Sequence, residues 1–349
     1  MLHSVSMRER VAVALHRTGA LTAMMRLRRV APGASPISIL TYHHVADQDD
    51  AYPYDRGVAD ASPTQFRRQM ELLARHCTPI GIDELVGAFD GAPLPKNPVM
   101  VTFDDGYRSC HDVALPILRA VGMRATFFVP TTFVAERRLF WWERIALVLS
   151  LSRVGSATIS YPRPLELATR DPRAQNVLTD LIKNTPELDI ERFLDELAAA
   201  FEVEWSREVE TRHADDLVMT WDHLRALAHA GMDVESHTRR HRVLQTLDAD
   251  GLRDELAGSR ADLEAQLGRP VRAIAYPVGR RIAHLTAIRA AVAAAGYKIG
   301  LSNASGVTRL PTDPFDVCRL STDRTMSDAM YFTQVAVPRL AYVSRANRV

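Results

Sequence analysis

Two adjacent aspartates at the end of an apolar run are the first candidates for chemistry. Residues 99–103 (VMVTF) are apolar or β-branched and follow Pro98, which predicts a buried strand. Asp104 and Asp105 come next, and Gly106 allows the chain to turn. Neighbouring side chains on an extended chain point to opposite sides, so we expect the two carboxylates to have different tasks. Taken alone the stretch also fits a solvated turn, but buried carboxylates are unfavourable unless they are paired or bind a metal.

A histidine pair follows a second expected strand. Residues 232–236 predict the strand, and His237 and His241 come directly after it. Two histidines at i and i+4 share one face of a helical turn, where we expect them to converge. One carboxylate and two imidazoles are a zinc ligand set that leaves a position open for water. The protease pattern HExxH is absent, because Thr238 occupies the place of its glutamate.

A third stretch, residues 271–280 (VRAIAYPVGR), completes a pattern of motifs. In order, TFDDGY at 102–107, SHTRRH at 236–241 and AYPVG at 275–279 resemble three motifs of the polysaccharide deacetylases that share the NodB homology domain. The branch that acts on biofilm polysaccharides is the most similar. The resemblance runs from about residue 35 to about residue 321, with an interruption. It implies a distorted (β/α)7 barrel and the metal-dependent removal of acetyl groups from a saccharide.

The same resemblance implies roles for the motif residues. Asp105, His237 and His241 would hold a divalent metal ion, expected to be Zn²⁺, and Asp104 would be the general base. The backbone N–H of Val278 would stabilise the oxyanion, although many members carry a tyrosine at that place. The side chains expected to contact the substrate are Tyr107, Tyr276, Pro277, Arg319, Trp141 and Trp142.

The general acid departs from the common family pattern. Many members carry it on a histidine in a late LxLxH motif, but residues 317–321 here read VCRLS. The biofilm branch instead has a histidine after an early strand, which matches the Tyr42-His43 step, so we expect His43 to be the acid. His44 and His284 are the alternatives. An arginine that braces the base in many members is missing from its usual place, and Arg319 is the expected substitute.

The strands that must position these residues recur in a βα rhythm. We expect seven strands, at residues 37–42, 99–103, 125–130, 232–236, 271–276, 297–301 and 317–320. Helical segments separate most of them, which indicates a parallel sheet, and seven such units suit a closed barrel. In a parallel barrel the chemistry gathers at the C-terminal strand ends. His43, Asp104, His237 and Val278 each follow a strand, so this argument supports the resemblance independently.

Residues 136–216 interrupt the rhythm and are expected to form a helical insertion. Residues 190–201 have apolar side chains at helical spacing, and residues 187–216 are strongly acidic. Trp141 and Trp142 stand near its start. They fit either an anchor that docks the insertion on the barrel or a wall or lid on which a sugar stacks.

The first 34 residues are expected to form a separate basic segment. Residues 1–30 carry six arginines against Glu9, with apolar side chains between them, which indicates one or two amphipathic helices. Such helices either pack on the domain or attach to an anionic membrane surface. The deacetylase domain is expected at residues 35–325, and residues 326–349 are expected to be a C-terminal tail.

Composition excludes several classes of protein. Hydrophobic residues make up 47% and charged residues 24%, and the net charge of +1 gives no reason to expect nucleic acid as a partner. Three cysteines without a CxxC pair argue against a disulfide scaffold or a thiolate zinc site. No apolar run is long enough to span a membrane, and arginines interrupt any signal-peptide core. We therefore expect a cytoplasmic location, with the inner-membrane surface as an alternative.

The function expected from these features is hydrolysis of an N-acetyl group, or an N-formyl group as an alternative, on an amino sugar. The sugar would belong to a polysaccharide or to a lipid-linked precursor. Removal of an O-acetyl group is a second enzymatic possibility. A saccharide-binding protein without activity is a third, although the intact Asp104, Asp105, His237 and His241 argue against it.

Overall fold

The computed structural model describes residues 6–49 and 52–341. The first five residues of the expected N-terminal segment and residues 342–349 of the expected tail lie outside the described residues.

Seven parallel strands close into a barrel, as the βα rhythm predicts. The ring runs β1, β12, β11, β10, β9, β6, β5 and back to β1, and every pairing in it is parallel. Its strands are β1 (Ser38–Tyr42), β5 (Pro98–Phe103), β6 (Thr126–Val129), β9 (Asp233–Ser236), β10 (Ala273–Ala275), β11 (Ile299–Ser305) and β12 (Val317–Ser321). A two-residue strand, β4 (Thr78–Pro79), pairs with the beginning of β5. The fold is a distorted (β/α)7 barrel.

Alternation along the strands separates two apolar clusters. The smaller one contains every second residue of several strands, such as Ile39, Met100 and Leu301, together with Ile82 and Leu85 of helix α4 (Ile82–Phe89). It fills the inside of the barrel, and α4 closes the end at which the strands begin. The larger cluster contains the alternate strand residues and the surrounding helices. Because successive residues of a strand face opposite sides of the sheet, each strand contributes side chains to both clusters.

The register of the strands brings the chemical residues to one level. Tyr42 of β1 lies opposite Phe103 of β5, so His43 and Asp104 leave the barrel side by side. The N–H of Asp104 donates to the carbonyl of Tyr42 (2.9 Å). The N–H of His237, directly after β9, donates to the last carbonyl of β6 (3.1 Å). The functional candidates therefore share the C-terminal rim of the barrel.

Helices surround the barrel in chain order. The helix α3 starts as its sequence predicts, with the Ser62 hydroxyl accepting from the N–H of Gln65 and Pro63 in the first turn. A π-type turn at Asp254–Gly258 joins α12 to α13 into one long helix. The helices around the barrel are α3 (Pro63–His76), α5 (Leu115–Ala120), α6 (Thr131–Glu136), α11 (Trp221–His229), α12 (Ala249–Arg253), α13 (Ser259–Leu267) and α14 (Thr286–Ala294).

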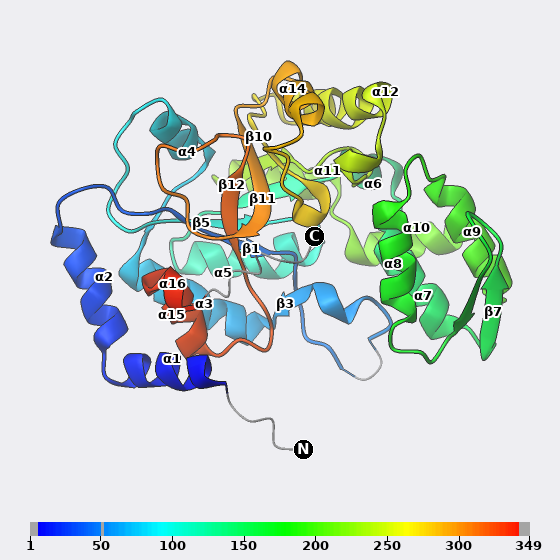
Figure 1. Cartoon of the computed structure of the whole chain (residues 1–349), viewed down its shortest axis with the longest axis horizontal. Coiled ribbons are helices and arrows are strands. Elements are labelled where there is room, and N and C mark those ends of the chain that lie inside the picture. The colour runs from blue at the N-terminus through cyan, green and yellow to red at the C-terminus, as the bar shows by residue number, and fades with distance from the viewer. Residues whose placement is uncertain (1–5, 50–51, 342–349) are drawn as a thin grey trace.

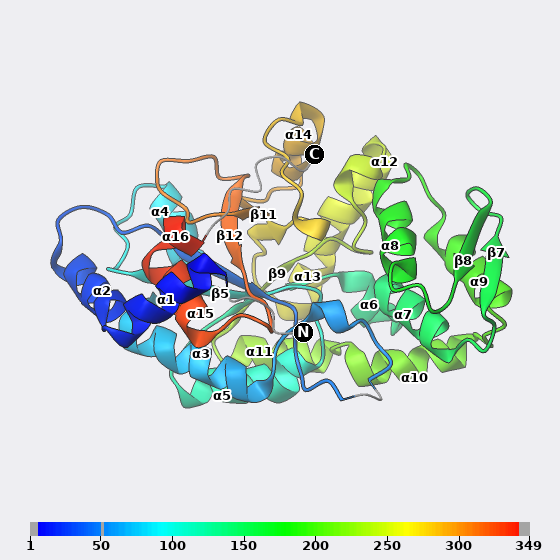
Figure 2. The ribbon, with the colours of Figure 1, turned by 60° about the horizontal axis from the view of Figure 1, so that its bottom comes forward.

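Residues between α6 and α11 form a lobe beside the barrel (Figures 1 and 2). Its helices are α7 (Trp141–Leu151), α8 (Ala174–Asn184), α9 (Ile190–Ala200) and α10 (Arg207–Leu217). The insertion is mostly helical, as expected, and it also contains β7 (Ser156–Ile159) and β8 (Leu165–Ala168), which form an antiparallel hairpin that was not predicted. Most residues of the hairpin strands are exposed or half-buried, so the strands lack the continuous apolar run by which buried strands are recognised.

The basic N-terminal segment forms α1 (Met7–Arg17) and α2 (Ala20–Val30), at the opposite end of the molecule from the lobe (Figure 1). Both helices pack against α15 (Asp328–Ala336), which lies within the segment expected to be a tail and is mostly buried. Arg28 donates to the carbonyls of Val335 (3.3 Å) and Ala336 (2.5 Å) at the end of α15. The last helix is α16 (Pro338–Ala341). Among the described residues, no helix combines the length and apolar character that crossing a bilayer requires.

Candidate active site

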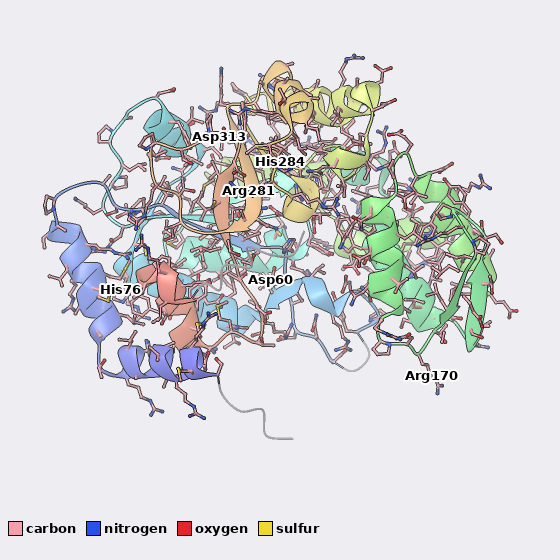
Figure 3. The ribbon with its side chains drawn as sticks, in the orientation of Figure 1. Asp60, His76, Arg170, Arg281, His284 and Asp313 are labelled. Carbon is pink, nitrogen blue, oxygen red and sulfur yellow. The ribbon has the colours of Figure 1, made fainter. Side chains whose placement is uncertain are left out.

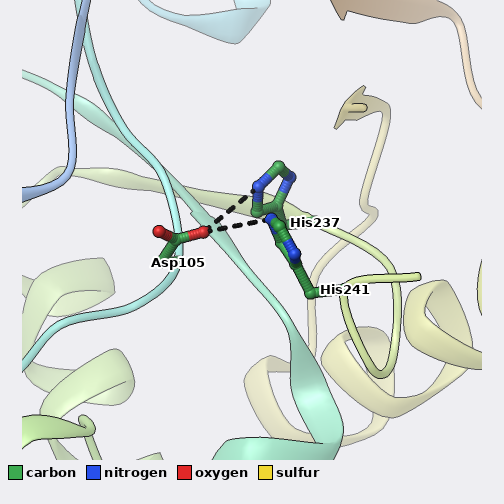
Figure 4. Close-up of side chains that lie close together, drawn as sticks. All are labelled: Asp105, His237 and His241. Carbon is green, nitrogen blue, oxygen red and sulfur yellow. Dashed lines mark ion pairs between the residues drawn. The ribbon is translucent and has the colours of Figure 1, made fainter. Parts of the chain in front are cut away.

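Asp105, His237 and His241 converge on the barrel rim (Figure 4). Asp105 Oδ1 lies 3.4 Å from His237 Nε2 and 3.3 Å from His241 Nε2, and all three side chains are buried. The His237 ring hydrogen-bonds through Nδ1 to the Ala275 carbonyl (2.7 Å), which must be the acceptor. This bond fixes the orientation of the ring and turns Nε2 toward the carboxylate.

The histidine pair does not lie on a helical turn, so that part of our expectation is wrong. Residues 237–241 form a loop after β9, with positive φ at Thr238 (68°) and His241 (52°). The loop holds the two imidazole rings 4.7 Å apart and nearly perpendicular. Asp105 and Val278 also have positive φ, so four of the eight such non-glycine residues among those described lie at this rim. Strained backbone of this kind is concentrated at functional sites.

The three side chains fit a divalent metal ion. Asp105 Oδ1 and His241 Nδ1 are buried without a hydrogen-bond partner, and an unpaired buried carboxylate oxygen is unfavourable. Burial, opposed by the charge of Asp105, lowers the pKa of His241 to about 3, so its ring is neutral as a metal ligand must be. Burial would raise the pKa of Asp105, but the hydrogen bond of His237 and the neighbouring His241 and His43 outweigh it and lower that pKa. Neutral imidazoles and a carboxylate are a common ligand set for zinc.

Asp104 points away from this cluster and is held by Arg319. Arg319 Nη1 donates to Oδ1 (2.8 Å) and Nη2 to Oδ2 (2.7 Å), and both side chains are almost fully buried. Burial would raise the pKa of Asp104, but Arg319 and then His237 lower it far below its ordinary value. Arg319 therefore takes the bracing position that the sequence leaves vacant elsewhere. Arg319 does not line the cavity described below, and its contact here is with Asp104 instead of the cavity.

His43 is paired with Asp60, a residue that the sequence did not indicate. The backbone N–H of His43 donates to Asp60 Oδ2 (2.6 Å), and its ring Nδ1 lies 3.0 Å from the same oxygen. Burial would lower the pKa of His43, but the charge and hydrogen bond of Asp60, with smaller contributions from Asp105 and Asp104, raise it to about 10. Because Nδ1 is engaged, Nε2 is left to face the cavity that His43 lines.

The two alternative histidines are placed differently. The His44 ring hydrogen-bonds through Nδ1 to the Ser109 hydroxyl (2.7 Å), and burial, with the charge of Arg324, lowers its pKa to about 4. His284 is exposed in the loop before α14, and Figure 3 shows it well apart from Asp60, the partner of His43. Neither lines the cavity.

The AYPVG stretch forms a tight turn at the rim. Val278 has φ of 62°, and no hydrogen-bond partner is found for its N–H among the described residues. Gly279 also has positive φ, and a Cβ there would lie 2.3 Å from the Asn303 side chain, so no other residue fits. Val278, Gly279 and Asn303 line the cavity. Tyr276 is buried and donates its hydroxyl to the Phe315 carbonyl (2.9 Å), and Pro277 is buried beside it, so neither reaches the cavity.

Trp141 and Trp142 join the lobe to the site. Both are about 95% buried, at 4% and 5% exposure, yet both line the cavity. Trp142 stacks on Phe140 (4.9 Å between ring centroids) and lies 4.6 Å from the ring of His241. Its Nε1 donates to the Tyr107 hydroxyl (2.7 Å). The two tryptophans therefore anchor the lobe and also form a wall of the cavity.

Tyr107 is buried behind that wall. Its hydroxyl donates to Glu143 Oε1 (2.5 Å), and Glu143 Oε2 accepts from the N–H of Asp55 (2.7 Å). Burial raises the pKa of Glu143 to about 8. Tyr107 is thus a structural link between the TFDDGY motif and α7, and it does not line the cavity described below.

The cavity over this rim measures about 350 Å³, at the small end of the range for ligand sites. The barrel contributes the acidic residues and histidines, and α8 of the lobe contributes Gln175, Asn176, Thr179 and Lys183. A second cavity of about 390 Å³ lies behind Trp141. Many of its charged residues are paired with one another, as in Arg138 with Glu210 (2.7 Å), so we assign it no chemistry.

The sequence profile named Polysaccharide deacetylase matches residues 91–300, which is more than half of the chain. The chain belongs to the polysaccharide deacetylase family. None of the curated protein sequences matches it. The fold is similar to that of Streptococcus pyogenes deacetylase PplD in complex with acetate, with a TM-score of 0.58, 18% identity and coverage of 88% of this chain and 100% of that one.

Two further solved structures share the fold of this polysaccharide deacetylase. IcaB from Ammonifex degensii has a TM-score of 0.54 at 18% identity and covers 89% of this chain and 98% of its own. The BpsB deacetylase domain from Bordetella bronchiseptica has a TM-score of 0.50 at 20% identity, covering 84% and 99%. At these identities the likeness establishes the architecture of the deacetylase.

Sequence reasoning missed the parts of the deacetylase site that lie outside its motifs. Asp60 sits in β3 (Ala59–Ala61), which pairs with β2 (His44–Val45) beside the rim. These strands are too short to show a period of two, so no signal was available. Glu143 and the polar face of α8 lie in the insertion. The helical spacing of residues 175, 179 and 183 was the one signal that could have drawn attention to that face.

Proposed function

We propose that this polysaccharide deacetylase is a metal-dependent N-deacetylase that hydrolyses the acetamide of an amino sugar and leaves a free amine. Asp105, His237 and His241 would hold the divalent ion, with Zn²⁺ favoured by the ligand types. Such an ion, when bound, lowers the pKa of water and polarises a carbonyl oxygen. The remaining tasks fall to the side chains and backbone around it.

Asp104 is proposed as the general base. Its bidentate pair with Arg319 fixes the carboxylate and keeps it ionised, so it is ready to accept a proton. The same pair makes Asp104 a weak base, so the proton must come from a donor that is itself acidic. The unpartnered N–H of Val278 is proposed to donate to the developing oxyanion, because a fixed backbone donor needs no reorganisation as the charge forms.

His43 is proposed as the general acid that protonates the departing nitrogen. This assignment is the reason for proposing an amide and not an ester as the substrate. An amine leaves poorly unless it is protonated, whereas an alkoxide of a sugar is less dependent on a strong donor. The His43–Asp60 pair keeps the imidazole charged with Nε2 directed to the cavity. A site equipped with a persistent proton donor suits an N-acetyl group better than an O-acetyl group.

The proposal is tested with His43→Ala on an N-acetylated oligosaccharide and on an activated acetyl ester. We expect hydrolysis of the amide to fall by roughly 10²–10⁴-fold, the usual contribution of a general acid. The ester, whose leaving group needs less protonation, should lose far less. His44→Ala serves as the matched control, because its ring faces Ser109.

Three results would count against the proposal. Equal losses on amide and ester would assign His43 a role in binding or folding. Release of acetate from O-acetylated but not from N-acetylated saccharides would favour the esterase. Binding of saccharide with no acetate release from either, in protein loaded with metal, would favour the non-catalytic alternative.

A further inference from the structure

The helix α8 turns a polar face to the active-site cavity. Gln175, Thr179 and Lys183 follow one another at intervals of four residues, which places them on one side of the helix, and Asn176 lies beside them. Thr179 uses its hydroxyl within the helix, on the Asn176 carbonyl (3.1 Å). For the side chains of Gln175, Asn176 and Lys183, no hydrogen bond or ion pair is found within the described part of the chain. These groups are therefore available to a ligand.

Lys183 is the cation of this surface. Among the described residues it is the only lysine or arginine that lines the cavity. The chain has only three lysines, Lys96, Lys183 and Lys298, against forty arginines. The ammonium of Lys96 is already bound, because it donates to the carbonyls of Ala31 (2.7 Å) and Gly33 (2.8 Å).

The carboxylates that share the cavity with Lys183 are already engaged. Asp104 is bound by Arg319, and Asp105 belongs to the histidine cluster. The side chain of Asp55 accepts from the N–H of Gly57 (2.7 Å). Within the described residues, no carboxylate therefore forms an ion pair with the ammonium of Lys183, although a cavity strengthens the field of a charge that lines it.

We propose that α8 selects the substrate and that Lys183 binds an anionic oxygen group, a carboxylate or a phosphate, on or next to the amino sugar. This inference rests on the function proposed above. A neutral hydroxyl could also accept from Lys183. An anion gives a shorter and stronger charge-assisted hydrogen bond, and it offsets the loss of hydration that the ammonium suffers when the cavity fills. The position of α8 between the barrel and the hairpin allows it to contact such a group while the acetamide lies over the rim (Figures 1 and 2).

The test compares three substrates: a neutral N-acetylglucosamine oligosaccharide, an N-acetylated oligosaccharide that contains a uronic acid, and N-acetylglucosamine 1-phosphate. We expect the protein to prefer one of the two anionic substrates. Lys183→Met should lower that preference, measured as a ratio of kcat/KM values, by about 10-fold and mainly through KM, because one charge-assisted hydrogen bond is lost. Lys183→Arg should restore part of it. If Lys183→Met loses a preference for the uronic-acid oligosaccharide, the group bound by Lys183 is a carboxylate. If it loses a preference for N-acetylglucosamine 1-phosphate, the group is a phosphate.

The matched control is Lys298→Met. Lys298 is exposed and precedes β11 at the opposite end of the barrel, so this variant should leave the ratio unchanged. An equal loss on neutral and anionic substrates in Lys183→Met would show a structural role and overturn the inference. So would the absence of any preference in the unaltered protein. Acetate release from the neutral substrate alone would leave the proposed deacetylase intact while this inference fails.

A binding measurement keeps the inference testable if no substrate is turned over. Reductive ¹³C-methylation of the three lysines gives few signals, and Lys183→Arg identifies the one from Lys183. Titration with glucuronic acid or with N-acetylglucosamine 1-phosphate should shift the Lys183 signal to saturation and leave the Lys298 signal in place. N-acetylglucosamine at the same concentration should shift the Lys183 signal much less. Equal shifts with the neutral sugar would refute the preference for an anion.

Discussion

Replacing Asp60 with asparagine isolates the charge that supports His43. Asparagine has nearly the same shape, and its side-chain oxygen can still accept from the backbone N–H and ring Nδ1 of His43, which now lie 2.6 Å and 3.0 Å from Asp60 Oδ2. The fold should therefore be kept. What is lost is the negative charge beside the imidazole. Asp60 does not act on the substrate in this scheme but positions and charges the residue that does.

The expected magnitude follows from the pKa of His43. Burial lowers this pKa, and Asp60 is the main group that outweighs burial and raises it to about 10. A general acid acts in its protonated form, so His43 does not limit activity below about pH 10 in the unaltered protein. In Asp60→Asn the pKa should fall at least to the ordinary value of about 6.5. Only about 1% of the imidazole is then protonated near pH 8.5, so activity there should be roughly 100-fold lower.

The assay is the initial rate of acetate release from an N-acetylated oligosaccharide between about pH 5.5 and about pH 9, at constant metal content. The ratio of unaltered to variant kcat/KM should rise with pH, up to tenfold per pH unit above the new pKa. Asp250→Asn removes an exposed charge whose ion-pair partner among the described residues is Arg253, and it should leave the profile unchanged. A ratio that is constant across the pH range would refute the reasoning, because it would show that Asp60 acts through structure and not through the proton on His43.

Three further outcomes test the rest of the site and the N-terminal helices. The protein should bind about one divalent ion, and His237→Ala should weaken that binding by more than the roughly 10–100-fold that loss of an outer-shell partner costs, as metal analysis after dialysis would show. Asp104→Asn should abolish most activity and keep the metal; metal loss in that variant, with retention in Asp105→Asn, would reverse the two roles. We also propose that α1 and α2 contact an anionic membrane, because Arg26, Leu27 and Arg29 are all exposed on α2. Flotation with anionic liposomes should then show binding that salt weakens, and no binding at low salt would leave packing on α15 as the role of these helices.

Local patterns predicted the parallel strands and the rim on which the chemical residues lie, and the resemblance of the motifs implied that these strands close into a distorted (β/α)7 barrel. Buried strands are recognised in a sequence as apolar runs, and parallel strands of a barrel end at a common rim. His43, Asp104 and His237 could therefore be placed together from the sequence. Asp104 and Asp105 do have different partners, as expected, because one is bound by Arg319 and the other faces the histidines. The reason differs from the predicted alternation, because Asp105 has a φ of 71° and lies in the turn after β5. These predictions depend only on patterns a few residues long, and such patterns can be read directly from the sequence.

Only the tertiary structure decided which groups support the rim. Asp60 reaches His43 from a strand of three residues, too short to show a period, and the pairing of β2 with β3 holds it beside the rim. The spacing of His237 and His241 suggested a helical turn, yet they lie in a loop with left-handed backbone at Thr238 and His241. This loop brings both rings to Asp105. Lys183 lies in α8 of the insertion, and the sequence of this helix has only the pattern of an ordinary amphipathic helix, so it did not indicate a role for the lysine. The spacing of residues along the chain determines which helices and strands form and which way their side chains point. The partner of a side chain depends on contacts between segments that are far apart in the sequence, and tertiary packing alone fixes those contacts.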